Sequence, residues 1–292
     1  MKRMLLLLLV MQIVLAGTCL AEKVLVDPYA GAPAEAALSE ELAARLTAAT
    51  GEEYAVRHEA DTASAVNAFL QLDGGSALLV CNQEALILSL QGYTNQDLRT
   101  ALQPVTCVAA SESMIYAAPA VTELIPEKSA EALIAYTEEN PYEVVIARLI
   151  DASPFDYLVL KATEDMYVDE ELYMDFDEAS QAAQDGAAEI LVLSEAMKPE
   201  GTDVYEPFCL TGLPGIWQGV FLQAGADSAW LEQLNDTLGG LKNDEAWQQM
   251  IAAAGYSSAP CPAPEEFASE VKSLFEQYVQ YLTNEGLFFY EE

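Results

Sequence analysis

The chain has 292 residues, 52% of them hydrophobic, and it carries 47 acidic against 12 basic side chains, a formal net charge of −35. The apolar fraction is typical of a folded protein, and the length allows two lobes with separate cores. A surface this acidic repels nucleic acid and anionic lipid, so neither is expected as a partner.

Residues 1–21 read as an export signal. Two basic residues precede the apolar run of residues 4–17, and small residues lead to a cleavage position after Ala21. The run is too short and too lopsided for an ordinary membrane-spanning helix. The stretch "LAGTC" also approaches a lipoprotein signal, with Cys19 as the lipidated residue. We therefore expect an exported protein, either periplasmic or anchored at the cell surface through that cysteine.

Strand-like runs alternate with helical patterns along the rest of the chain. The expected strands are 23–26, 53–57, 76–80, 104–110, 113–118, 143–147, 189–193 and 216–222. Helices are expected over 35–51, with an apolar stripe of Leu38, Leu42 and Leu46, over 129–139, and near the C-terminus, where Phe267, Val271, Leu274, Tyr278 and Leu282 recur at helical spacing. This alternation predicts an α/β fold with a largely parallel sheet covered on both faces.

Four strand-to-helix loops are the expected places for a ligand. They are residues 27–34, 58–65, 81–84 and 147–154. In open α/β sheets, ligands bind outside the carboxyl ends of strands, close to helix N-termini.

The sequence gives little support to catalysis. His58 is the single histidine, and there is no G-x-S-x-G, phosphate-loop or dinucleotide-binding motif. His58 follows a strand and could line a cleft, but a lone histidine is more often structural or at the surface. The acidic stretch 163–180 lacks the spacing and the central glycine of an EF-hand, so it is interpreted as a solvated face. We expect no enzyme activity, no cofactor and no metal site.

Cysteines and tryptophans leave alternatives open. Outside the signal lie Cys81, Cys107, Cys209 and Cys261, which allow three pairings or free buried thiols. Trp230 and Trp247 lie in helical patterns and are expected in the core, whereas the place of Trp217, in the 216–222 strand, stays open.

The order of several motifs resembles that of one receptor family. The stretch 212–279 resembles the C-terminal third of tripartite tricarboxylate transporter receptors, also called Bug-type receptors. The matching pieces are "TGLPG" (211–215), "QAGAD" (223–227), "NDEAW" (243–247), "AAAG" (252–255) and "PAPEEF" (262–267), with "PVTCVAA" (104–110) and "SAEALIAYTEENP" (129–141) further upstream. Each motif is modest, but together they cover nearly the whole exported chain.

The resemblance implies a two-lobed fold of the type II periplasmic binding proteins, with lobes joined by crossing strands. Lobe 1 would comprise residues 22–110 and 216–292, and lobe 2 residues 111–215, shortened relative to the family near residues 165–185. Such receptors capture small carboxylates without catalysis and deliver them to a pair of membrane permease subunits. A monomer that binds a small organic acid is expected here.

The loops depart from the family pattern. Where the family reads "PFPPGGGTD", this chain reads "DPYAGAPAE", and Pro33 removes a backbone donor. Where the family reads "ASSGNGSSSHL", this chain reads "ARLIDASPFDY" (147–157), which introduces an arginine and an aspartate. The residues expected to contact ligand are Tyr29, Ala30, Gly31, Ala32, Asn82, Gln83, Arg148, Asp151 and Ser153.

Two questions remain open at this level. Arg148 could grip a carboxylate with two parallel hydrogen bonds, or it could pair with Asp151 or another nearby acid. The acids Glu35, Asp61, Glu84 and Asp151 would equally suit a ligand ammonium group. The altered loops also allow a second function, a sensing or interaction module that has lost its transport cargo.

Overall fold

The computed structural model describes residues 23–150, 153–174, 176–194 and 205–287. The signal segment, with Cys19, and the candidate ligand residue Asp151 lie outside the described residues. Within these ranges, one sheet has eight strands in the order β2-β1-β3-β8-β4-β7-β5-β6. No helix in the described ranges is long and apolar enough to cross a membrane.

The first half of the chain contains β1 (Lys23–Asp27), α2 (Pro33–Thr50), β2 (Tyr54–His58), α3 (Thr62–Gln71), β3 (Ala77–Cys81), α4 (Glu84–Leu90), α5 (Leu98–Ala101), β4 (Leu102–Ala117), α6 (Pro119–Leu124), α7 (Ala130–Glu139) and β5 (Val145–Leu149). The second half contains α8 (Pro154–Ala162), β6 (Asp169–Tyr173), α9 (Phe176–Gln184), β7 (Ile190–Ser194), β8 (Glu206–Gln223), α10 (Ser228–Gly239), the short 3₁₀ helix η2 (Gly240–Asn243), α11 (Glu245–Ala253) and α12 (Pro264–Asn284).

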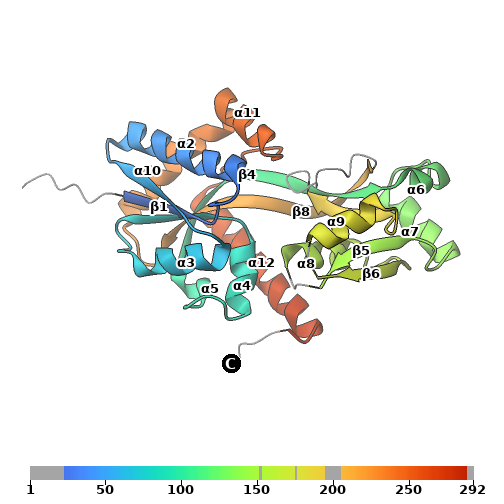
Figure 1. Cartoon of the computed structure of the whole chain (residues 1–292). Helices are drawn as coiled ribbons and strands as arrows, with labels where there is room; N and C mark the ends of the chain where they lie inside the picture. The colour runs from blue at the N-terminus through green and yellow to red at the C-terminus, as the bar shows by residue number, and fades with distance from the viewer. Residues whose placement is uncertain (1–22, 151–152, 175, 195–204, 288–292) are drawn as a thin grey trace, which may run out of the picture.

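Two lobes are joined by the long antiparallel pair β4 and β8, which runs from one lobe into the other (Figure 1). The register of this pair shifts between Ala110 and Glu112 and again between Glu112 and Met114, at the passage between lobes. Such shifts bend and twist a strand pair locally. The crossing strands expected from the sequence are therefore confirmed.

Lobe 1 is a three-layer unit around β2, β1 and β3, which are parallel to one another. One face of the sheet packs against α2, α10 and α11, and the leucine stripe expected in α2 is buried there, with Leu46 fully inaccessible. The other face packs against α3, α4 and α12, with Phe69, Phe221 and Phe267 in its core. Trp230 and Trp247 lie in the first of these cores, as expected.

Lobe 2 contains the parallel strands β5, β6 and β7, and it is also held by the last helix. In Figure 1, α12 begins at lobe 1 and runs on past α8 of lobe 2. The ring of Tyr278 packs edge-on against that of Tyr157 in α8, with centroids 5.1 Å apart. The lobes are therefore connected by α12 as well as by the two crossing strands.

The structure corrects three expectations about the elements. The sheet is mixed and not largely parallel, because the β4–β8 pair at its centre is antiparallel to its neighbours. The runs 104–110 and 113–118 form one strand, and β8 begins at Glu206, ten residues before the expected start. Part of the acidic stretch 163–180 forms the edge strand β6, and α9 follows it.

Candidate functional site

The loop after β1 is tied back to lobe 1. The Tyr29 side chain is buried, and its hydroxyl donates to Gln218 Oε1, while Gln218 Nε2 donates to the Tyr256 hydroxyl at 2.6 Å. Ala30 N donates to Glu59 O at 3.1 Å, and Ala32 N donates to Tyr29 O at 3.1 Å. Ala30 and Gly31 are exposed. Of the four residues expected here, these two form the accessible tip of the loop.

Asp27 and His58 form a pair at the ends of β1 and β2. His58 Nδ1 lies 2.8 Å from Asp27 Oδ1, which also accepts from Tyr29 N at 3.2 Å. Burial lowers the pKa of His58, but the hydrogen bonds to Asp27 and Glu40 outweigh it and raise that pKa above its usual value. The single histidine therefore braces the loop through Asp27.

The loop after β3 holds the crossing strand. Gln83 is buried; its Nε2 donates to Gly215 O at 2.9 Å, and its Oε1 accepts from Trp217 N at 3.1 Å. Asn82 Oδ1 accepts from Glu84 N, in the first residue of α4, at 2.9 Å. Gln83 therefore ties the start of α4 to β8 where β8 enters lobe 1.

Arg148 lies in a cluster of acids. Its guanidinium forms two hydrogen bonds with Asp156, 2.6 Å from Nε to Oδ1 and 3.3 Å from Nη2 to Oδ2, and one 3.0 Å bond each to Glu170 and Glu285. The Tyr281 hydroxyl also donates to Asp156. Burial lowers the pKa of Arg148, but the three carboxylates outweigh it and raise that pKa. Pairing with nearby acids, the second of the two roles considered for Arg148, is the one seen in this structure.

Ser153 begins α8 and brings an aromatic residue to the boundary between the lobes. Its hydroxyl accepts from Phe155 N at 3.2 Å and Asp156 N at 3.3 Å, a helix N-cap. The Phe155 ring then packs against the lobe 1 core of α2, α10 and α11 and against the core of lobe 2. Phe155 is the interlobe contact that sequence reasoning missed. The available signal was an apolar residue in the first helical turn directly after a ligand loop.

The described residues around the predicted ligand loops carry hydrogen-bonding groups and carboxylates, and few reactive groups. His58 is engaged with Asp27, and no group of three or more metal-ligating side chains gathers anywhere in the described ranges. The four cysteines at 81, 107, 209 and 261 are free thiols. Burial, chiefly, raises the pKa of Cys209 to about 11, which keeps that thiol protonated.

The comparisons place this architecture among known folds. No family model and no curated protein matches the sequence. A TctC solute-binding protein from Polaromonas matches with a TM-score of 0.71 at 12% identity, over 91% of this chain and 100% of that one. MatC from Rhodopseudomonas palustris with bound malate matches with a TM-score of 0.57 at 14% identity, over 88% and 97%. A further R. palustris protein with adipate matches with a TM-score of 0.60 at 13% identity, over 91% and 97%.

At these identities the likeness establishes the fold. The chain has the two-lobed α/β architecture of periplasmic binding proteins, as the resemblance to the tripartite tricarboxylate receptors implied. The ligand residues and the lobe boundaries expected from the sequence stay predictions.

Proposed function

We propose that this chain is an extracytoplasmic solute-binding receptor. It captures a small organic acid, or a related small molecule, between its lobes as an exported monomer and delivers it to membrane permease subunits of a tripartite tricarboxylate-type transporter. The protein acts by binding and release, without catalysis. The hinge lies at the predicted lobe boundaries, 110/111 and 215/216, where the β4–β8 register shifts support it.

The observation that carries the proposal is the contact made by Phe155. It brings the first turn of α8, next to the loop 147–154, against the lobe 1 core that contains Leu38 and Val80. Leu38 lies in α2, just after the loop 27–34, and Val80 lies at the end of β3, just before the loop 81–84. The first turn of α8, beside the predicted lobe 2 loop, thus packs against the core that also contains residues next to two predicted lobe 1 loops, and this supports a small-molecule site between the lobes.

A carboxylate ligand needs hydrogen-bond donors, and most of the donors described around the predicted ligand loops already have partners within the protein. In the proposed complex, Arg148 keeps its buried partner Asp156 and exchanges one of its two more exposed acidic partners, called outer acids below, for the ligand carboxylate. Glu170 and Glu285 are the outer acids, with side chains 35% and 34% exposed, whereas that of Asp156 is 1% exposed. Glu170→Gln should therefore raise carboxylate affinity, because it removes a competing charge.

A second function follows from the same contact, because Phe155 already packs against the cores of both lobes. With Phe155 packed on both cores and Arg148 neutralised, the chain could serve as a sensing or interaction module without transport cargo. Such a module would respond to no small molecule.

A thermal-shift panel separates the two functions. The panel contains malate, adipate, citrate, amino acids and aromatic acids. A rise of several degrees with one class supports the receptor, because a ligand that binds only the folded state stabilises it. Ala30→Trp, at the exposed loop tip, should abolish that rise, and Ala48→Trp, exposed near the far end of α2, should not. If no compound of the panel raises the melting temperature, the result favours the sensing or interaction module.

A further inference from the structure

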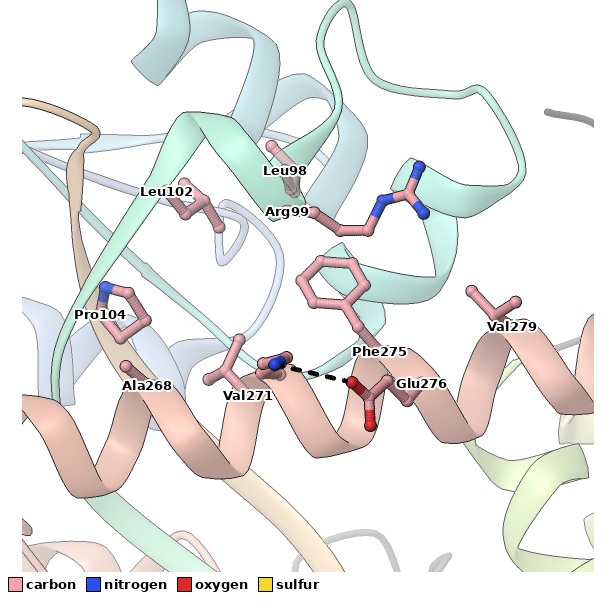
Figure 2. A pocket seen from close by; sticks show the side chains of 10 residues that line it. Leu98, Arg99, Leu102, Pro104, Ala268, Val271, Phe275, Glu276 and Val279 are labelled. Carbon is pink, nitrogen blue, oxygen red and sulfur yellow. Dashed lines mark ion pairs between the residues drawn. The ribbon is translucent and has the colours of Figure 1, made fainter. Parts of the chain in front are cut away.

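A groove lies on lobe 1, apart from the loops predicted to bind ligand. It has a volume of about 660 Å³ and separates α12 from the stretch that leads from α5 into β4 (Figure 2). Leu98, Leu102 and Pro104 line one side, and Val271, Phe275 and Val279 line the other. None of the nine residues expected to contact ligand takes part in it.

The apolar side of the groove follows from the pattern of α12. Val271, Phe275 and Val279 are spaced four residues apart, so they form one stripe about 12 Å long. Figure 2 shows this stripe facing Leu98 and Leu102 across the groove. Its volume falls within the range of roughly 300–1,000 Å³ that is typical of small-molecule sites. The shape suits an elongated apolar body that lies parallel to the helix.

The mouth of the groove is unusual in its charge. Arg99 and Lys272 border it, two of only 12 basic residues in a chain with 47 acids. Arg99 is held by Asp97, with Nη2 2.8 Å from Oδ2. Lys272 pairs loosely with Glu276, the only acid among the residues that line the groove, at 3.9 Å, and both side chains are largely exposed, at 78% and 70%. An exposed pair of this kind contributes little, so Lys272 is available to another anion.

From this arrangement we infer that the groove is a second binding site, for an amphipathic organic anion. The apolar body lies along Val271, Phe275 and Val279, and the carboxylate meets the ammonium group of Lys272. Arg99, paired with Asp97, borders the opposite side of the mouth. A cationic ligand would be repelled by the two basic side chains there, and a neutral apolar ligand would form no ion pair with them.

Titration calorimetry with decanoate, below its micelle concentration, tests the inference on the full exported chain. Ala268→Trp fills the groove from a half-buried position that lines it, and Lys272→Glu reverses the charge at its mouth. Lys242→Glu makes the same change in net charge at an exposed site in η2. Ala30→Trp blocks the proposed interlobe site, so decanoate bound there is counted separately.

The expected result is one decanoate site that survives Lys242→Glu and Ala30→Trp. Ala268→Trp should abolish this site, and Lys272→Glu should weaken it roughly three- to tenfold, because an exposed attraction is replaced by repulsion. Decyltrimethylammonium and decanol should bind more weakly than decanoate. The inference fails if decanoate does not bind, if binding is unchanged in both groove variants, or if either uncharged or cationic probe binds as well.

Discussion

Among charged residues, Arg148 should contribute strongly to stability, because it pairs with a buried carboxylate. In Arg148→Met, the carboxylate of Asp156, 1% exposed, stays buried without its cation. Stranding a buried charge typically costs about 3–5 kcal/mol. We expect urea unfolding to show a loss of unfolding free energy near the lower end of this range, because Glu170 and Glu285 leave the cluster partly open to water.

Arg45→Met is the matched control for Arg148. Arg45 pairs with Asp244 and Glu41, whose side chains are 34% and 36% exposed. Its removal should cost about 1 kcal/mol or less. Adding Asp156→Asn to Arg148→Met should recover part of the loss, since it removes the stranded charge. Equal losses for the two arginine variants would contradict the buried cluster.

His58 should make stability depend on pH. Its pKa is raised in the folded state, so the Asp27 contact stabilises fully below the unfolded value of about 6.5 and is lost as pH rises through the folded pKa. The stability gap between the wild type and His58→Asn should therefore be larger at pH 5.5 than at pH 9 in urea unfolding. Arg57→Gln, the exposed neighbour, should show a constant gap. A His58 gap independent of pH would refute this role.

Single residues also mark the limit of prediction from sequence. The stripes of α2 and α12 were predictable because buried positions repeat at helical spacing. The partners of Arg148 were not, since Glu170 and Glu285 are 22 and 137 residues away along the chain. With 47 acids available, sequence indicates that Arg148 finds a carboxylate but not which one.

At the scale of elements, the crossing of β4 and β8 depends on Gly215. A Cβ atom added there would lie 2.4 Å from the carbonyl oxygen of Ser111 and 2.6 Å from the carbonyl carbon of Glu112. Both are backbone atoms, so Gly215→Ala must displace a strand. We expect a loss of about 1–3 kcal/mol in urea unfolding, in the range of overpacking.

Gly239→Ala is the control for Gly215, because an added Cβ there meets nothing within 4 Å and the residue lies in α10. It should be neutral or slightly stabilising. If Gly215→Ala changed the free energy of unfolding as little as Gly239→Ala does, the close approach of the two strands would not hold in solution.

The elements that sequence missed share a physical reason. The stretch 206–215 contains two prolines and two glycines, which indicate turns, yet it forms the first half of β8 because β4 offers a long partner. The sequence of β6, "DEELY", was interpreted as part of a solvated face. Its side chains are indeed mostly exposed, but its backbone pairs with β5 as an edge strand. Tertiary pairing decided both cases.

For the molecule as a whole, Phe155 should control how the lobes meet. Its ring packs on the cores of both lobes, so Phe155→Ala removes one interlobe contact and leaves α12 and the crossing strands intact. We expect a larger radius of gyration by small-angle X-ray scattering without unfolding. Phe208→Ala, buried in another core, is a control that should lower stability without opening the lobes. An unchanged radius in Phe155→Ala would contradict the interlobe role.

The global architecture was predictable because ordered motifs fix the sequence of elements, and the strands and helices alternate. The closeness of the lobes was not, since it depends on contacts between residues far apart in the chain, such as Phe155 with the lobe 1 core and Tyr157 with Tyr278, which no local pattern encodes. The extreme charge of −35 gave no information on the fold, but it made each cation informative, and the groove beside Lys272 follows from that.

Native mass spectrometry, which detects a small molecule bound to the intact chain, tests the proposed capture of an organic acid between the lobes. The chain is measured as purified and with each acid that raises its melting temperature, beside Ala30→Trp and Ala48→Trp. We expect a one-to-one complex with one class of acid, lost in Ala30→Trp and kept in Ala48→Trp. No complex with any acid, or a complex equally present in both variants, would contradict it.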